Sequence, residues 1–158
     1  LLGAVPRLIR SARPADSAWL GLGLAILAAS RGDLLDAVVS VSSFAHPGEM
    51  MRQQMDRMPR AARFVILEAV QRMIGFRFDE IAPRNRIALV EVPVMLVHGD
   101  ADGVVPISSM YELSAANPTA ELLTVPDGAH SDLAPFEPYV GEILDFLKRH
   151  LGATDGKE

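Results

Sequence analysis

The 158-residue sequence contains no cysteine, so it has no disulfide, no thiolate nucleophile and no cysteine-based zinc site. Any catalysis must therefore use oxygen and nitrogen groups. The sequence also lacks an apolar run of the roughly 18 residues that a membrane span needs, because its longest run, at 19–29, is interrupted by glycine. The arginines near the N-terminus follow the first apolar residues instead of preceding them, unlike a signal peptide. These absences favour a cytoplasmic protein with no membrane partner.

Basic charge is also scarce, since the formal net charge is −5 and no run of lysine and arginine exceeds a pair. This balance argues against nucleic acid as a partner. No histidine has metal-ligand spacing to another histidine or to an acid, so we expect neither a metal nor a cofactor. With 49% hydrophobic residues, the sequence predicts one compact domain at 1–151, followed by a disordered polar tail at 152–158. Because the chain opens with Leu1 instead of methionine, we expect a fragment.

Three short apolar segments have the composition of buried parallel strands. They are rich in β-branched residues and end at glycine, serine, proline or aspartate. The strands are predicted at 37–42, from 92 to about 99, and at 121–125, with helices at 18–30, 107–116 and 136–151. Three strands are few for a doubly wound sheet. An exposed apolar edge at 37–42 would invite pairing, so a homodimer is expected as one outcome.

Residues 46–89 contain no segment that resembles a strand. Methionines alternate with polar residues before Pro59, and a second segment of helical periodicity follows. Helices inserted between two strands of a parallel sheet often cover its carboxyl edge, so we interpret this segment as a helical lid. Its methionines suit a surface that adapts to apolar ligands. The plainer interpretation, that they only pack a helical pair onto the core, has the higher prior.

The ends of the last two predicted strands supply an acid and a base. The strand that starts at 92 ends in Gly99 and is followed by Asp100 and Asp102, and the strand at 121–125 leads into a turn that carries His130. The carboxyl ends of neighbouring parallel strands share one edge of a sheet. A serine hydroxyl becomes a nucleophile when a neutral imidazole takes its proton and a carboxylate fixes the other ring nitrogen. Asp102 and His130 can fill these roles, and Asp100 is a rival acid that could instead bond turn amides.

These two turns carry a family resemblance. His-Gly-Asp-Ala-Asp-Gly-Val-Val-Pro at 98–106 resembles the acid-bearing turn of the α/β-hydrolase superfamily, and Gly-Ala-His at 128–130 resembles its histidine loop. The likeness covers about 18–151 and is nearest to dienelactone-hydrolase and prolyl-oligopeptidase-like serine esterases. It implies a partial α/β-hydrolase fold, a parallel sheet flanked by helices with a lid insertion at about 46–89. It also implies that Asp102 is the triad acid, that His130 is the base, and that the substrate is a small ester or amide.

The superfamily's nucleophile motif, Gly-x-Ser-x-Gly, is absent. Ser17 precedes the apolar helix without that glycine pattern, so it is more typical of a helix N-cap. Two hypotheses therefore remain open. In the first, the chain supplies the Asp and His of a serine hydrolase. In the second, it is a catalytically silent, truncated or degenerate module with a binding or dimerisation role. A flavodoxin-like ligand binder is weaker, because no glycine-rich phosphate loop follows a strand.

The other histidines are assigned to structure. His98 is expected to belong to its strand end, and His150 suits the negative end of a helix dipole. His46 lies beside a proline at the start of the insertion, where a surface role is favoured over a substrate contact.

Overall fold

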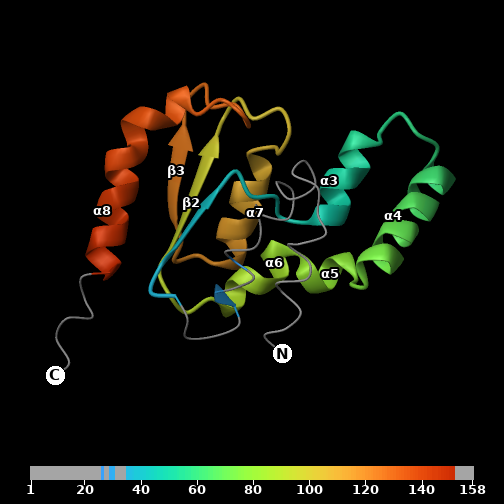
Figure 1. Cartoon of the computed structure of the whole chain (residues 1–158), viewed down its shortest axis with the longest axis horizontal. Helices are drawn as coiled ribbons and strands as arrows, with labels where there is room; N and C mark the ends of the chain where they lie inside the picture. Colours follow the sequence, from blue (N-terminus) through green and yellow to red (C-terminus); the bar gives the residue numbers. More distant parts are fainter. Residues whose placement is uncertain (1–25, 27–28, 31–34, 152–158) are drawn as a thin grey trace.

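The computed structural model describes residues 26, 29–30 and 35–151. Its centre is a three-stranded parallel sheet with the strand order β1-β2-β3 (Figure 1). The strands are β1 (Val38–Val41), β2 (Val94–Gly99) and β3 (Glu121–Val125). All three predicted strands are confirmed, and β1 and β2 are slightly shorter than expected. The parallel alignment places the carboxyl ends of β2 and β3 side by side.

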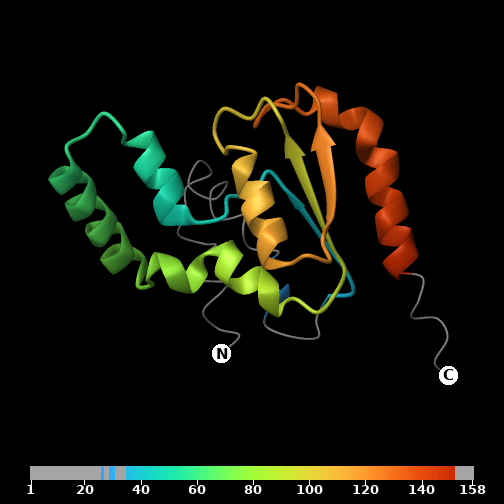
Figure 2. The same cartoon turned by 180° about the vertical axis from the view of Figure 1, so that it is seen from behind.

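Strand β2 is buried at every position because helices cover both faces of the sheet. Side chains alternate between the faces, so Val94 and Leu96 join one core cluster while Met95 and Val97 join the other. Helix α7 (Ser108–Ala116) packs in the first cluster and α8 (Val140–Leu151) in the second. Figures 1 and 2 show these two helices on opposite sides of the strands. The predicted parallel sheet flanked by helices is confirmed.

Helices fill the chain between β1 and β2, as the strand-free pattern predicts. They are α3 (Pro47–Gln54), α4 (Arg60–Ile74), α5 (Phe78–Ile81), α6 (Pro83–Arg86) and the 3₁₀ turn η1 (Ile87–Leu89). Helix α4 ends at Gly75, whose φ of 80° is the left-handed conformation that favours glycine. Helices α3 and α4 form a hairpin that extends away from the sheet, with α5 at its base (Figure 1).

The C-terminal helix differs from its predicted bounds. The segment expected as one helix at 136–151 is a 3₁₀ helix, η2 (Ala134–Tyr139), followed by α8. The division of this segment into η2 and α8 is explained by Pro138, which cannot donate a backbone hydrogen bond. Ile26 and Ala29, the described core residues of the predicted helix at 18–30, are buried as expected. The rest of that helix, the Ser17 cap, the N-terminal segment and the tail at 152–158 lie outside the described residues.

Candidate active site

The loops that follow β2 and β3 are in direct backbone contact. The N–H of Ala101 donates to the carbonyl of Gly128, and that of Asp100 to the carbonyl of Val125. A Cβ on Gly99 would lie 2.1 Å from the Gly128 oxygen, and a Cβ on Gly128 would lie 2.8 Å from the Gly99 Cα. Neither position has room for a side chain. The two glycines therefore let the loops approach closely enough for their side chains to meet.

Asp102 is held by bonds to both carboxylate oxygens. Its Oδ1 accepts from the backbone N–H groups of Val104 at 2.9 Å and Val105 at 2.8 Å. Its Oδ2 accepts from His130 Nδ1 at 2.8 Å, and the side chain is completely buried. A buried carboxylate is costly unless such donors compensate it. The local turn therefore fixes the position and direction of this acid.

The pKa of Asp102 reflects a competition between burial and hydrogen bonding. Burial on its own would raise the pKa of the carboxyl. The Val105 N–H, the His130 side chain and the Val104 N–H together outweigh burial and hold the pKa of Asp102 below its ordinary value of 3.8. Asp102 is consequently ionised at neutral pH, although no part of its side chain reaches solvent.

The bond to Asp102 also determines the tautomer of His130. Because Asp102 Oδ2 is an acceptor, the ring hydrogen lies on Nδ1, and Nε2 of the neutral ring is left as an acceptor. Among the residues that the structure describes, none forms a hydrogen bond with Nε2. The side chain is 20% exposed, in contrast to its buried partner. The arrangement can take a proton from a group that approaches the open side of the ring.

The structure places the neighbouring candidates in supporting positions. Asp100 Oδ1 accepts from the backbone N–H of Asp127 at 2.7 Å, which joins the two loops, and Asp100 has no bond to His130. His98 is buried at the end of β2, where its Nε2 donates to the carbonyl of Val105 at 2.9 Å. The assignment of His98 to the strand end is confirmed. His98 also steadies the residue whose N–H holds Asp102.

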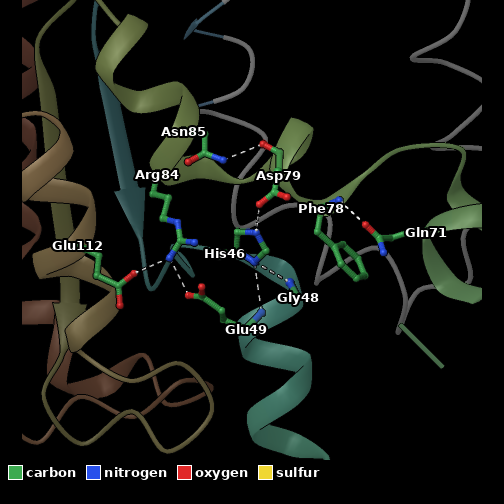
Figure 3. Close-up of polar contacts among 9 residues, drawn as sticks. All are labelled: His46, Gly48, Glu49, Gln71, Phe78, Asp79, Arg84, Asn85 and Glu112. Carbon is green, nitrogen blue, oxygen red and sulfur yellow. Dashed lines mark hydrogen bonds and ion pairs between the residues drawn. The ribbon is translucent and has the colours of Figure 1, made fainter. Parts of the chain in front are cut away.

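The surface role predicted for His46 is wrong. His46 is only 5% exposed and caps α3, accepting at Nδ1 from the backbone N–H groups of Gly48 and Glu49. Its Nε2 donates to Asp79 Oδ1 at 2.9 Å (Figure 3). Histidine is not a usual N-cap residue, so composition gave little reason to expect this. The following proline, at the first position of α3, was the available signal for a helix start.

The sequence left two interpretations of the insertion's methionines, an adaptable apolar surface and plain packing onto the core, of which packing was favoured. Met50 packs with Phe44 and Val105 beside the acid-bearing turn. The larger cavity of the insertion has no methionine in its lining. For Met50 the packing interpretation therefore holds.

Within residues 35–151, no group of three or more histidine and acidic side chains is arranged to hold a metal ion. The described helices also include none that is long and apolar enough to cross a membrane.

Comparisons with known proteins place this geometry in a known fold. No protein-family model matches the chain. A curated proline iminopeptidase of Xanthomonas citri is 36% identical over 81 residues, which are 51% of this chain and 23% of that protein. A puromycin-hydrolysing peptidase of Mycobacterium tuberculosis superposes with a TM-score of 0.61 at 18% identity, covering 80% of this chain and 20% of that one. An esterase domain from Rhodothermus marinus gives 0.60 at 18% identity, covering 84% and 58%.

The described structure has the α/β-hydrolase fold, in part, and its structural neighbours are esterases and peptidases with that fold. The resemblance to α/β-hydrolases that the two sequence turns carry is confirmed as a shared fold. The chain spans about a quarter of the curated relative that it matches.

Proposed function

We propose that Asp102 and His130 are the acid and the base of a serine hydrolase that acts on carboxylic esters or amides. The observation that carries this proposal is the 2.8 Å bond between His130 Nδ1 and Asp102 Oδ2, in which the carboxylate is buried and the imidazole is partly exposed. A buried, ionised acid that fixes one ring nitrogen and leaves the other open is what a proton-shuttling histidine requires. The peptidase and esterase activities named for the similar proteins support the same reaction class.

In the proposed reaction, a serine oxygen attacks the carbonyl carbon while its proton passes to His130 Nε2. Asp102 stabilises the imidazolium that forms, and the proton then moves to the leaving alcohol or amine. Water repeats the sequence on the acyl-enzyme and releases a carboxylic acid. No hydroxyl group among the described residues is hydrogen-bonded to His130, so the proposal assigns only the acid and the base to this part of the chain.

The insertion at 46–89 is proposed to act as the lid of this site. Its helix α3 packs Met50 against Val105, the residue whose N–H holds Asp102. A movement of α3 would therefore displace Val105 and change the position of the acid-bearing turn.

A serine-reactive fluorophosphonate tests the assignment. The enzyme that contains this chain together with its serine nucleophile is expected to be labelled, and Asp102→Asn and His130→Ala are expected to slow its labelling about 10²- to 10⁴-fold while the protein stays folded. Asp100→Asn is the matched control, because Asp100 is an acid on the same turn whose side chain, among the described residues, bonds the Asp127 amide and not His130. Labelling that survives both His130→Ala and Asp102→Asn would reject the assignment.

A catalytically silent binding or dimerisation module is the second candidate. It is favoured by the position of β1 at the edge of the described sheet and by Val41, which is 41% exposed there. For this candidate the folded protein is expected to resist the fluorophosphonate entirely and to sediment as a dimer. A labelled monomer would exclude it.

A further inference from the structure

The hairpin of α3 and α4, closed at its base by α5, encloses a cavity of about 400 Å³. This volume is in the range of small-molecule sites. The lining combines charged and apolar side chains from all three helices and the turn before α5. Its members are His46, Arg52, Arg60, Arg63, Phe64, Leu67, Glu68, Gln71, Arg77, Phe78 and Asp79.

The lining has an excess of positive charge in a chain whose net charge is negative. Four arginines face two acids, and both acids already have partners. Glu68 lies 3.3 Å from Arg77, and Asp79 lies 2.9 Å from His46. The other three arginines form no ion pair or side-chain hydrogen bond with any residue that the structure describes. They are Arg52, Arg60 and Arg63. Guanidinium groups with unused donors around one cavity attract an anion, and their planar fork matches a carboxylate.

Apolar side chains provide the rest of the lining. Leu67 and Phe78 are buried, while Phe64 remains 66% exposed although it borders the cavity. A small inorganic ion would contact the arginines and leave this surface in water. A ligand with an apolar body would cover it and gain about 25 cal/mol for each Å² removed from water.

Hydrogen bonds between the helices hold the walls of the cavity together without a ligand. The Nε2 of His46 joins α3 to Asp79 of α5, and the Oε1 of Gln71 on α4 accepts from the backbone N–H of Phe78 at 2.9 Å (Figure 3). Arg77 and Glu68 add a second link between α5 and α4. A cavity that is already formed loses less conformational freedom when it binds a ligand.

We propose that this cavity binds a carboxylate attached to an aliphatic or aromatic body, with the carboxylate at the arginines and the body against Phe64, Leu67 and Phe78. A carboxylic acid is also what the hydrolysis of an ester or amide releases, so the ligand belongs to the product class of the proposed reaction. That link rests on the proposed function, whereas the binding does not.

Calorimetric titration of the unaltered protein with octanoate tests the proposal. Octanoate is expected to bind saturably, and both acetate and 1-octanol at least about tenfold more weakly, because each lacks one half of the recognised chemistry. Octanol binding as tightly as octanoate would overturn the proposal, as would an absence of saturable octanoate binding. Inorganic phosphate binding more tightly than octanoate would overturn it too, because the site would then be one for a bare anion.

Single substitutions locate the binding. Arg60→Gln and Arg63→Gln are each expected to weaken octanoate binding about tenfold, the loss of a charge-assisted hydrogen bond. Arg57→Gln removes the same charge from an exposed arginine outside the cavity lining and is expected to change affinity less than about twofold. An equal loss in all three variants would contradict the site, since it would indicate attraction by overall charge. None of these substitutions touches Asp102 or His130. Octanoate binding therefore tests the cavity, and fluorophosphonate labelling tests the proposed function, so either can fail without the other.

Discussion

Among the residues that the structure describes, the pairs His130–Asp102 and His46–Asp79 have nearly equal lengths, and they differ in which member is buried. His130 and Asp102 are 2.8 Å apart, with the acid buried and the histidine 20% exposed. His46 and Asp79 are 2.9 Å apart, with the histidine 5% exposed and the acid 82% exposed. In the first pair the charged group is removed from water and the ring reaches the surface. In the second, the ring is part of the interior and the charge remains solvated.

The pairs also fix opposite ring tautomers. His130 carries its hydrogen on Nδ1 and leaves Nε2 open, whereas His46 accepts two backbone N–H groups at Nδ1 and donates from Nε2. Both nitrogens of His46 are therefore occupied by structural bonds. A short contact between histidine and aspartate does not by itself indicate catalysis. The open nitrogen and the buried carboxylate are the features that distinguish the candidate active site.

Replacing the acid of each pair by alanine is expected to give the largest difference between the two pairs in the free energy of unfolding. Asp102→Ala leaves the Val104 and Val105 N–H groups without their acceptor and should lower the free energy of unfolding by about 3 kcal/mol. Asp79→Ala removes a solvated group and should cost clearly less. Urea unfolding of both variants measures the difference. Equal losses would show that burial of the acid does not distinguish the two pairs.

Protonating Asp102 should have a smaller effect than removing it, because the protonated carboxyl keeps its size and one acceptor oxygen. The pKa of Asp102 in the folded protein lies below its ordinary value of 3.8. The folded state therefore binds fewer protons than the unfolded state in this range. The stabilisation is fully present above the unfolded pKa and is lost as the pH falls through the folded pKa.

The measurement is the free energy of unfolding of the unaltered protein and of Asp102→Asn across acidic pH. The difference between them should narrow as the pH falls below about 4. Asp79, whose pKa is lowered chiefly by its hydrogen bond to His46, is present in both proteins and cancels in the comparison. A difference that widens on acidification would contradict the assigned direction.

The contact between the two site loops can be broken through Gly128. A Cβ there would meet Gly99 Cα at 2.8 Å and both Phe136 Cε2 and the Val125 oxygen at 3.1 Å. Gly128→Ala should therefore separate the loops and cost about 1–3 kcal/mol in unfolding free energy, with a weakened bond between His130 and Asp102. Gly103→Ala is the matched control, because a Cβ at Gly103 meets nothing within 4 Å. Similar stabilities for the two variants would mean that close approach of the loops is not required.

The sheet and the contact between Asp102 and His130 were predictable because each depends on local signals. The apolar runs at β2 and β3 end abruptly at glycine, aspartate or proline, and parallel strands bring such ends to one edge. The turns that follow these two strands then place Asp102 and His130 next to each other at that edge. The resemblance of the two turns added the choice of Asp102 over Asp100, which the residues alone had left open.

The insertion was less predictable because its important contacts are between distant residues. His46 and Asp79 are 33 positions apart, and Gln71 reaches the amide of Phe78 across a helix end. An adaptable apolar surface was only the less favoured interpretation of the methionines, and the sequence pattern did not indicate a cavity lined by arginines from α3, α4 and the turn before α5. Periodicity indicated the helices and gave no information on which faces would meet.

The smallest effect expected here separates the two functions of His46. Asparagine is a good N-cap residue, so His46→Asn should keep the cap of α3 and lose only the bond to Asp79, whereas His46→Ala should lose both. The alanine variant should be about 1 kcal/mol less stable than the asparagine variant. Hydrogen exchange at the Gly48 and Glu49 amides should accelerate in the alanine variant alone. If both variants exchange alike, the Asp79 bond and not the cap holds the start of α3, and His46 would then resemble His130 in depending chiefly on its aspartate.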